Sequence, residues 1–169
     1  MTASACSAML TDYGHLLRED AEYGQRAARV SALARDISQV VLANADPLRA
    51  ALHRKGQNAQ PGLPVAFQSP CTLQHALQIR GVVESLLTEA GFTLTQVPDS
   101  HLCCGSAGTY SILQPGLSSR LLSAKVAALE QGAPAVIVTA NVGCQTQLRS
   151  GTSLPVRHWI ELLETRLAG

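Results

Sequence analysis

The residues of this chain best suited to chemistry are its cysteines. Five occur among 169 residues, and four of them are Cys71, the adjacent pair Cys103 and Cys104, and Cys144. Thiolates bind metals and take part in redox reactions. An odd, grouped set of cysteines in a reducing compartment favours these roles over a disulfide framework. We therefore expect the function to reside at these cysteines.

The elements that must position the cysteines alternate between strands and helices from residue 61 to residue 169. Short apolar or alternating runs predict strands at 64–68, 92–97, 135–139 and 154–157. Apolar residues at near-helical spacing follow the strands and predict helices at 73–87, 115–129, 144–150 and 159–167. The alternation predicts an α/β domain: a Rossmann-like parallel sheet of about four strands with flanking helices.

In this arrangement each of the four cysteines comes after a strand. Cys71 follows the first strand, Cys103 and Cys104 the second, and Cys144 the third. The carboxyl ends of parallel strands form the edge of an open α/β sheet where ligands bind. Helix N-termini at Cys71 and Cys144 favour thiolates, and the glycine-rich run 105–108 offers backbone N–H groups to sulfur. We predict that the four cysteines meet on one rim.

Three kinds of site fit such a rim. A tetrahedral zinc ion takes four thiolates, but an adjacent Cys-Cys pair chelates one ion awkwardly. A vicinal disulfide at Cys103 and Cys104, with His101 as a base, leaves Cys71 and Cys144 without a role. An iron–sulfur cluster accommodates the pair best, because its several irons share the ligands. For the isolated Cys6, a small buried hydrophobe is the simpler interpretation.

Other polar residues give weaker signals. His101 lies in the loop of the cysteine pair, either as a hydrogen-bond donor to a cluster or as a polar loop residue. His75 and His158 stand at predicted helix starts, where capping or packing is expected. Ser106 lacks the spacing of a nucleophile elbow. The neighbouring glycines match no dinucleotide-binding or Walker motif, so hydrolase and nucleotide-binding functions are not indicated.

Composition narrows the classes of partner. The chain is 46% hydrophobic and 15% charged, with 13 basic and 12 acidic residues, which is typical of a globular protein. A formal charge of +1 without a basic stripe argues against a nucleic-acid partner. The chain shows no signal-peptide pattern and no apolar run near the roughly 18 residues of a membrane span, so we expect a cytoplasmic location.

Residues 1–60 follow a different plan. They show no strand pattern, helical stretches are expected around 23–41, and a polar linker with glycine and proline covers 55–64. Segment 2–10 resembles segment 139–148, since each brings one cysteine to the start of a helix. We predict that 1–60 is the tail of a first domain plus a helical linker, and that 61–169 is a complete domain.

Three runs carry a family resemblance: HLCCGSAGTY at 101–110, TANVGCQT at 139–146 and VRHWIE at 156–161. With them, nearly the whole chain resembles the C-terminal part of glycolate oxidase (glycolate dehydrogenase) iron–sulfur subunits. These belong to the cysteine-rich CCG domain family, which includes subunits of the heterodisulfide reductase B type. In this resemblance 1–60 contains the end of a first cysteine-rich domain, and Cys6 is its last ligand.

The resemblance implies an electron-transfer part of a glycolate-oxidising complex, with no active site of its own. Electrons would pass from flavin-containing subunits through a [4Fe-4S] cluster toward a membrane acceptor, and the chain would be cytoplasmic or peripheral at the inner membrane through its complex. The implied ligands are Cys71, Cys103, Cys104 and Cys144. A zinc-bound or metal-free docking module that holds the flavin subunits together is the alternative.

Two departures from the family pattern bear on this expectation. The fifth cysteine of the family motif falls on Gln147, which favours a cluster held by four thiolates, or an incomplete site, over a cluster held by five. The ferredoxin-like segment with which the family's subunits begin does not occur in this sequence, so the chain resembles a fragment of such a subunit.

Overall fold

The computed structural model describes residues 1–55 and 62–168. At its centre is a parallel sheet of four strands in the order β2-β1-β3-β4. The strands are β1 (Pro64–Gln68), β2 (Thr93–Leu94), β3 (Val136–Thr139) and β4 (Val156–His158). From β1 the chain moves to one edge of the sheet and from β3 to the other, so the topological switch point lies between β1 and β3. This confirms the predicted α/β class.

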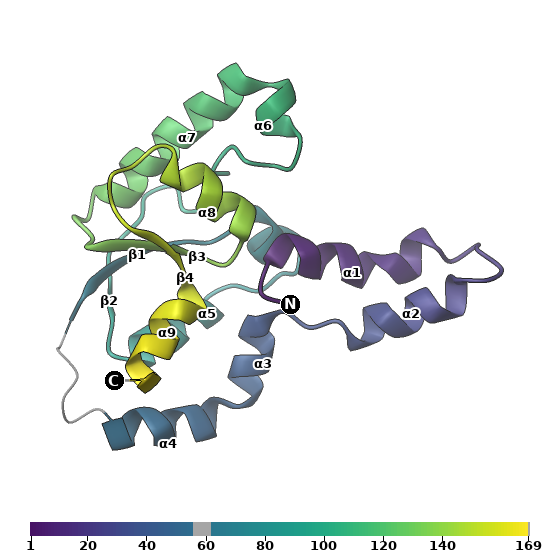
Figure 1. Ribbon diagram of the computed structural model, residues 1–169, viewed down its shortest axis with the longest axis horizontal. Coiled ribbons are helices and arrows are strands. Elements are labelled where there is room, and N and C mark those ends of the chain that lie inside the picture. The colour runs from purple at the N-terminus through teal and green to yellow at the C-terminus, as the bar shows by residue number, and fades with distance from the viewer. Residues whose placement is uncertain (56–61, 169) are drawn as a thin grey trace.

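Helices cover both faces of the sheet. The helices α5 (Val82–Glu89) and α9 (Trp159–Ala168) lie below it in Figure 1, and α7 (Pro115–Glu130) and α8 (Val142–Arg149) lie above it. Successive strand residues point to opposite faces, so β1 and β3 contribute to two cores. Toward α5 and α9 they present Val65, Phe67, Val136 and Val138, and toward α7 and α8 they present Ala66 and Ile137. All of β3 is buried, as its apolar sequence predicts.

Two predicted elements are wrong in extent. The strand predicted at 92–97 pairs only at Thr93 and Leu94. The N–H of Thr95 still donates to the carbonyl oxygen of Val65 at 2.9 Å, and the chain then leaves the sheet for the cysteine loop, residues 98–109. The helix predicted at 73–87 is broken into a π-helical turn η2 (Thr72–Ala76) and α5, because Gly81 adopts a φ of +74° between them.

The fourth strand is shifted relative to the prediction. It was expected at 154–157 and pairs at Val156–His158, since Pro155 has no N–H to donate and contributes only its carbonyl oxygen, which accepts from Ile137. A short helix that the sequence pattern did not indicate, α6 (Tyr110–Leu113), follows the cysteine loop.

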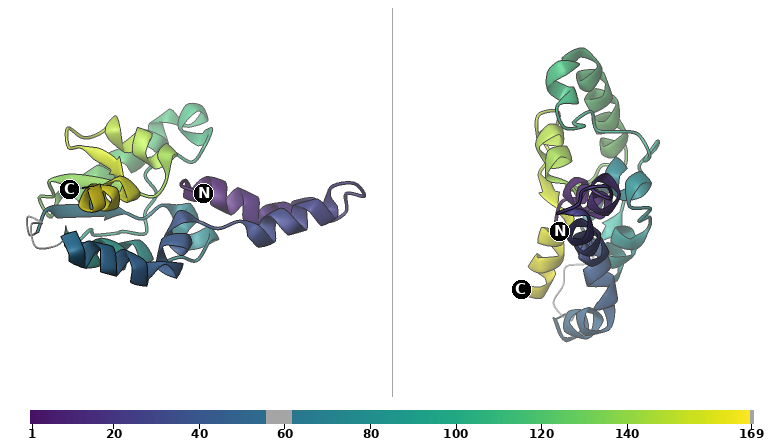
Figure 2. Two further views of the ribbon diagram at one scale, coloured as in Figure 1. Left: turned by 60° about the horizontal axis from the view of Figure 1, so that its bottom comes forward. Right: turned by 90° about the vertical axis from the view of Figure 1, so that its right-hand side faces the viewer.

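Residues 1–55 contain no strand, as predicted, but their helices extend well beyond the stretch expected around 23–41. They form α1 (Ser4–Leu16), α2 (Gly24–Leu33), α3 (Ile37–Ala43) and α4 (Ala45–Lys55). Helices α1 and α2 make a hairpin that projects from the α/β body (Figure 2). The apolar side chains of α3 and α4 instead pack against the core shared by α5 and α9. The predicted boundary at residue 60, and most of the linker at 55–64, fall outside the described residues.

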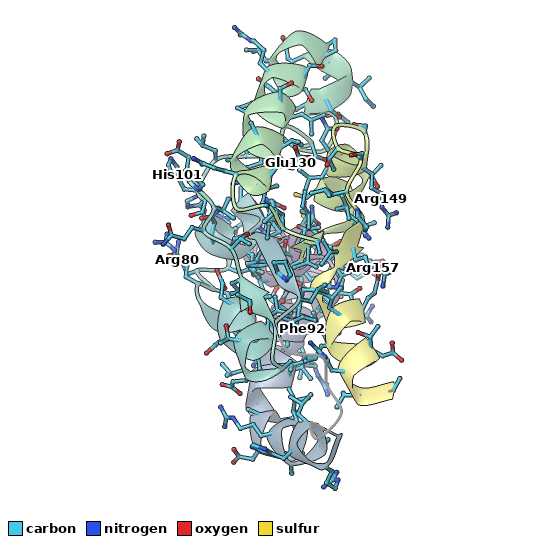
Figure 3. All side chains as sticks on the ribbon, turned by 90° about the vertical axis from the view of Figure 1, so that its left-hand side faces the viewer. Arg80, Phe92, His101, Glu130, Arg149 and Arg157 are labelled. Carbon is cyan, nitrogen blue, oxygen red and sulfur yellow. The ribbon has the colours of Figure 1, made fainter. Side chains whose placement is uncertain are left out.

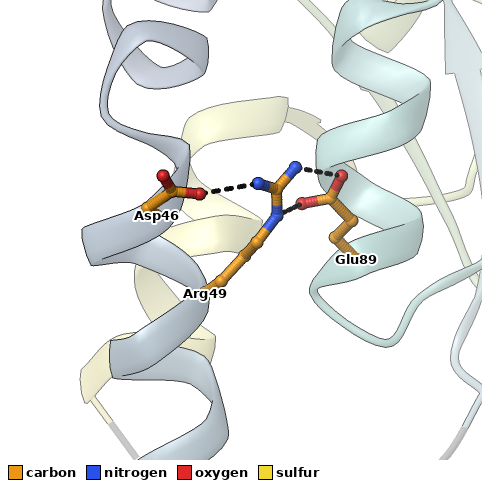
Figure 4. A network of polar contacts seen from close by, with 3 residues as sticks. All are labelled: Asp46, Arg49 and Glu89. Atoms are coloured by element: carbon orange, nitrogen blue, oxygen red, sulfur yellow. Dashed lines mark hydrogen bonds and ion pairs between the residues drawn. The ribbon is translucent and has the colours of Figure 1, made fainter.

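An ion-pair network joins α4 to α5. The guanidinium of Arg49 donates to both carboxylate oxygens of Glu89, at 2.8 and 3.0 Å, and to Asp46 at 2.9 Å (Figure 4). This arrangement lowers the pKa of the Glu89 carboxyl. The three side chains face solvent, which screens their attraction, so the network orients α4 more than it stabilises the fold.

His158 attaches the N-terminus to the end of β4. Its Nδ1 accepts from the N–H of Ile160 at 3.3 Å, so Nε2 carries the proton and donates to the carbonyl oxygen of Thr2 at 2.7 Å. The contact to Ile160 serves the start of α9, in agreement with the capping role expected for a histidine at that position. The imidazole is buried, which lowers its pKa.

This burial predicts a pH-dependent stability. The folded state binds a proton at His158 less readily than the unfolded chain, whose value is about 6.5. Stability from His158 is therefore present above that value and is lost as the pH falls below it, by about 1.4 kcal/mol for each unit of pKa depression. Urea unfolding between pH 8 and pH 5 should show this loss in the wild type and not in His158→Gln. Parallel profiles for the two proteins would contradict the assignment.

Candidate functional site

The structure brings four thiols together at the carboxyl edge of the sheet. They interact pairwise through hydrogen bonds, Cys71 with Cys103, Cys103 with Cys104, and Cys104 with Cys144. We call these four side chains the thiol row. Cys104 and Cys144 are buried, and Cys71 and Cys103 are half-buried. The row lies where β1 and β3 end, at the switch point at which open α/β sheets bind ligands.

The hydrogen bonds of the row divide it into donors and acceptors. The thiols of Cys104 and Cys71 donate to Cys103, and the N–H of Gly105 adds a contact to its sulfur at 3.3 Å, so the pKa of Cys103 is lowered. The pKa values of Cys71 and Cys104 are raised, first by these donated hydrogen bonds and also by burial. Of Cys71, Cys103 and Cys104, Cys103 therefore loses its proton most readily to form a thiolate.

Cys144 is the second thiolate site. Its pKa is lowered, chiefly because Cys104 donates to it. The amide Nδ2 of Asn141 also donates to the Cys144 sulfur at 3.5 Å. Asn141 is buried just before α8, and its Oδ1 accepts from the N–H of Ala5 at 3.4 Å. The site thus combines four cysteine sulfurs with N–H donors directed at two of them, and N–H donors of this kind tune iron–sulfur centres.

The thiols interact in pairs along the row, from Cys71 through Cys103 and Cys104 to Cys144. Across 1–55 and 62–168, no group of three or more His, Cys, Asp or Glu side chains is arranged so that it could hold a metal ion as it stands. All five cysteines are free thiols. His101 is exposed, and Figure 3 places it at the periphery of the molecule, on the same side as Arg80. This placement favours the expectation that His101 is a polar loop residue.

Gly105 gives the cysteine loop its shape. It adopts a φ of +89°, and a Cβ on it would lie 2.5 Å from the carbonyl oxygen of Ser118 in α7. The hydroxyl of Ser118 donates to the Gly105 carbonyl oxygen at 2.9 Å and accepts from Nε2 of Gln147 at 3.0 Å. Gln147 thus supports the loop through Ser118.

Cys6 lies apart from the interactions of the thiol row. It is exposed on α1, so the expectation of a buried hydrophobe is wrong. The first turn of α1 nevertheless lies at the same edge of the sheet. The Ser4 N–H donates to the carbonyl oxygen of Ala140 at 3.0 Å, and its hydroxyl lies 2.7 Å from that of Thr72. The start of α1 is therefore a neighbour of the residue that follows Cys71.

Two residues of the site were missed in the sequence. Asn141 precedes a predicted helix and contacts a cysteine three positions later, which is a spacing that helix-capping rules make recognisable. Lys125 is fully buried on α7 behind the cysteine loop. It interrupts an apolar face formed by Leu121, Leu122, Val126 and Leu129, and this interruption was the available signal.

The fold and the site define a Rossmann-like domain with grouped cysteines at its switch point, and comparison with known proteins agrees. The family profile described as "Cysteine-rich domain" (CCG) matches residues 65–149. The chain belongs to the CCG cysteine-rich domain family, which confirms the resemblance found in the sequence.

Relatives with assigned names extend this comparison. The chain is 49% identical over 166 residues to the glycolate oxidase iron-sulfur subunit of Escherichia coli (strain K12), covering 98% of this chain and 39% of that protein. It is 31% identical over 150 residues to the probable glycolate oxidase iron-sulfur subunit of Bacillus subtilis (strain 168), covering 88% and 32%. Lactate utilization protein A of Geobacillus kaustophilus (strain HTA426) is 25% identical over 172 residues, covering 97% and 68%. The chain therefore spans about two fifths of the first relative and a third of the second.

No helix in the two described ranges has the length and apolar character needed to cross a membrane.

Proposed function

We propose that this chain is the cluster-binding, electron-transfer part of a glycolate-oxidising complex. The thiol row supplies the ligands of one [4Fe-4S] cluster, namely Cys71, Cys103, Cys104 and Cys144. The observation that carries this proposal is the convergence of these four thiols at the topological switch point, with N–H donors directed at Cys103 and Cys144. The names of the relatives, which are iron-sulfur subunits, support it.

The thiols of the site differ in how readily they could bind a metal group. Metal ligation requires deprotonated thiols, and Cys103 and Cys144 are already biased toward thiolates. Cys71 and Cys104 hold the protons that binding would release. When bound, a cluster of this type accepts and releases single electrons.

The partners follow from the family. Flavin-containing subunits would oxidise glycolate and deliver electrons to this chain, and a membrane acceptor would receive them. In this assignment the chain has no active site of its own, and it would be cytoplasmic or peripheral at the inner membrane through its complex. The zinc-bound or metal-free docking module is retained as the competing outcome of the experiment.

Metal and sulfide analysis of the anaerobically purified chain tests the proposal. We expect about four irons and four sulfides per chain, with an EPR signal after reduction by dithionite. Zinc without sulfide would favour the docking module and overturn the electron-transfer function. A chain that carries neither metal, even after reconstitution with iron and sulfide, would also overturn it.

A further inference from the structure

Lys125 places an ammonium group inside the protein. The side chain is 1% exposed, and its Nζ donates to the carbonyl oxygens of Ser100 at 2.9 Å and Asp99 at 3.3 Å. Neither of these acceptors carries a formal charge, and none of the ion pairs in the described parts of the chain includes Lys125. A buried charge is costly unless an opposite charge lies nearby.

The thiol row supplies that opposite charge. Burial lowers the pKa of the Lys125 amine, and the thiols of Cys104, Cys103 and Cys144, when ionised, act in the other direction, together with the exposed Asp99. Four thiolates around an iron–sulfur cluster leave a net negative charge, because the cluster core offsets only part of theirs. The cation and the ligand set are therefore complementary, and Lys125, Cys104 and Cys144 are buried, where charges interact more strongly than in water.

Lys125 also holds the backbone that carries the cysteine pair. Ser118 and Lys125 are two turns apart on α7 and lie on the same buried face. Ser118 binds the carbonyl group of Gly105, just after the pair, and Lys125 binds two carbonyl groups just before it. The held segment is strained, since Asp99 adopts a φ of +48° without being glycine.

We propose that Lys125 is a positioning residue and the internal counter-charge of the thiol row, so that it holds the cysteine loop in place and raises the reduction potential of the cluster. This inference rests on the proposed function for its redox part only. A positive charge stabilises the reduced, more negative form of a cluster more than the oxidised form, which moves the potential upward.

The test compares four variants of the whole chain, loaded with iron and sulfide under identical anaerobic conditions. Lys125→Met removes the charge at similar volume, Lys125→Gln removes it but keeps an N–H donor, and Lys125→Arg keeps it. The matched control is Arg120→Met, which removes a positive charge from an exposed position of the same helix. EPR-monitored titration with a graded reductant gives the midpoint potential of each.

We expect both neutral variants to have a more negative midpoint potential than the wild type, while Lys125→Arg and Arg120→Met stay close to it. If a neutral variant loses iron, retention of iron in Lys125→Arg identifies the charge as the requirement. Unchanged potentials in Lys125→Met and Lys125→Gln would overturn the counter-charge role. If Lys125 only filled space, Lys125→Arg would not restore the midpoint potential or the iron content.

Hydrogen exchange on the metal-free chain separates this inference from the proposed function. Loss of the Lys125 contacts should speed the exchange of backbone amides in residues 99–104 by at least about tenfold in Lys125→Met and not in Arg120→Met. Equal exchange in the two variants would overturn the positioning role. A wild-type chain that binds no iron would overturn the proposed function. The exchange experiment would then still test whether Lys125 positions the cysteine loop.

Discussion

Cys104→Ser is expected to reduce the iron content of the anaerobically purified chain from about four atoms to less than about one. Cys104 is the most buried member of the thiol row, and it interacts with both Cys103 and Cys144. Its loss therefore breaks the row in the middle. Serine is close in size but binds iron poorly, so the effect is on ligation and not on packing. Colorimetric iron and sulfide analysis measures it.

Cys6→Ser is the matched control for this prediction. Cys6 is an exposed thiol on α1, outside the interactions that define the row, and its replacement should leave iron and sulfide unchanged. Thermal unfolding of both variants is the check that each is folded. Full iron occupancy in Cys104→Ser would remove Cys104 from the ligand set, and an equal loss in Cys6→Ser would show that the analysis reports something other than ligation by the row.

The strand-end positions of the cysteines were predictable because they depend on local signals. Turn residues end each strand beside Cys71 and Cys144, and the alternation of strands with helices predicts that the strands run parallel. The parallel sheet therefore placed the four thiols on one rim without knowledge of any long-range contact. The interior pairing of Cys104 with Cys144, and the order of donors and acceptors, depend on side-chain directions that no periodicity encodes.

Two of the errors share one physical cause, which is that the segments carrying the cysteines depart from regular structure. The alternation in 92–97 predicts a strand of full length, but the chain must leave β2 early to reach the rim. The apolar spacing of 73–87 predicts one helix, but the turn that follows Cys71 is a separate element that positions its sulfur at the rim. The burial of Lys125 was also not predicted, because helix propensity and hydrophobicity do not predict that a lysine is buried to bind the backbone of the cysteine loop.

Gly105→Ala is expected to destabilise the fold by about 3 kcal/mol, because two effects combine. The residue has a φ of +89°, a conformation that costs an L-amino acid about 1 to 2 kcal/mol. The added Cβ would also lie 2.5 Å from the Ser118 carbonyl oxygen. That oxygen belongs to the backbone of α7, so relief requires the helix or the cysteine loop to move.

Gly108→Ala separates the two effects. Gly108 lies in the same loop with a φ of +62°, but a Cβ there meets no atom within 4 Å. The Gly108→Ala substitution should lower the free energy of unfolding by about 1 kcal/mol, from the backbone conformation alone. Urea unfolding of the metal-free chains gives both values, and equal losses would show that the loop moves freely away from α7. A larger loss in Gly105→Ala, accompanied by weaker iron retention, is expected because the contact between Gly105 and Ser118 holds the Cys103 and Cys104 backbone at the rim.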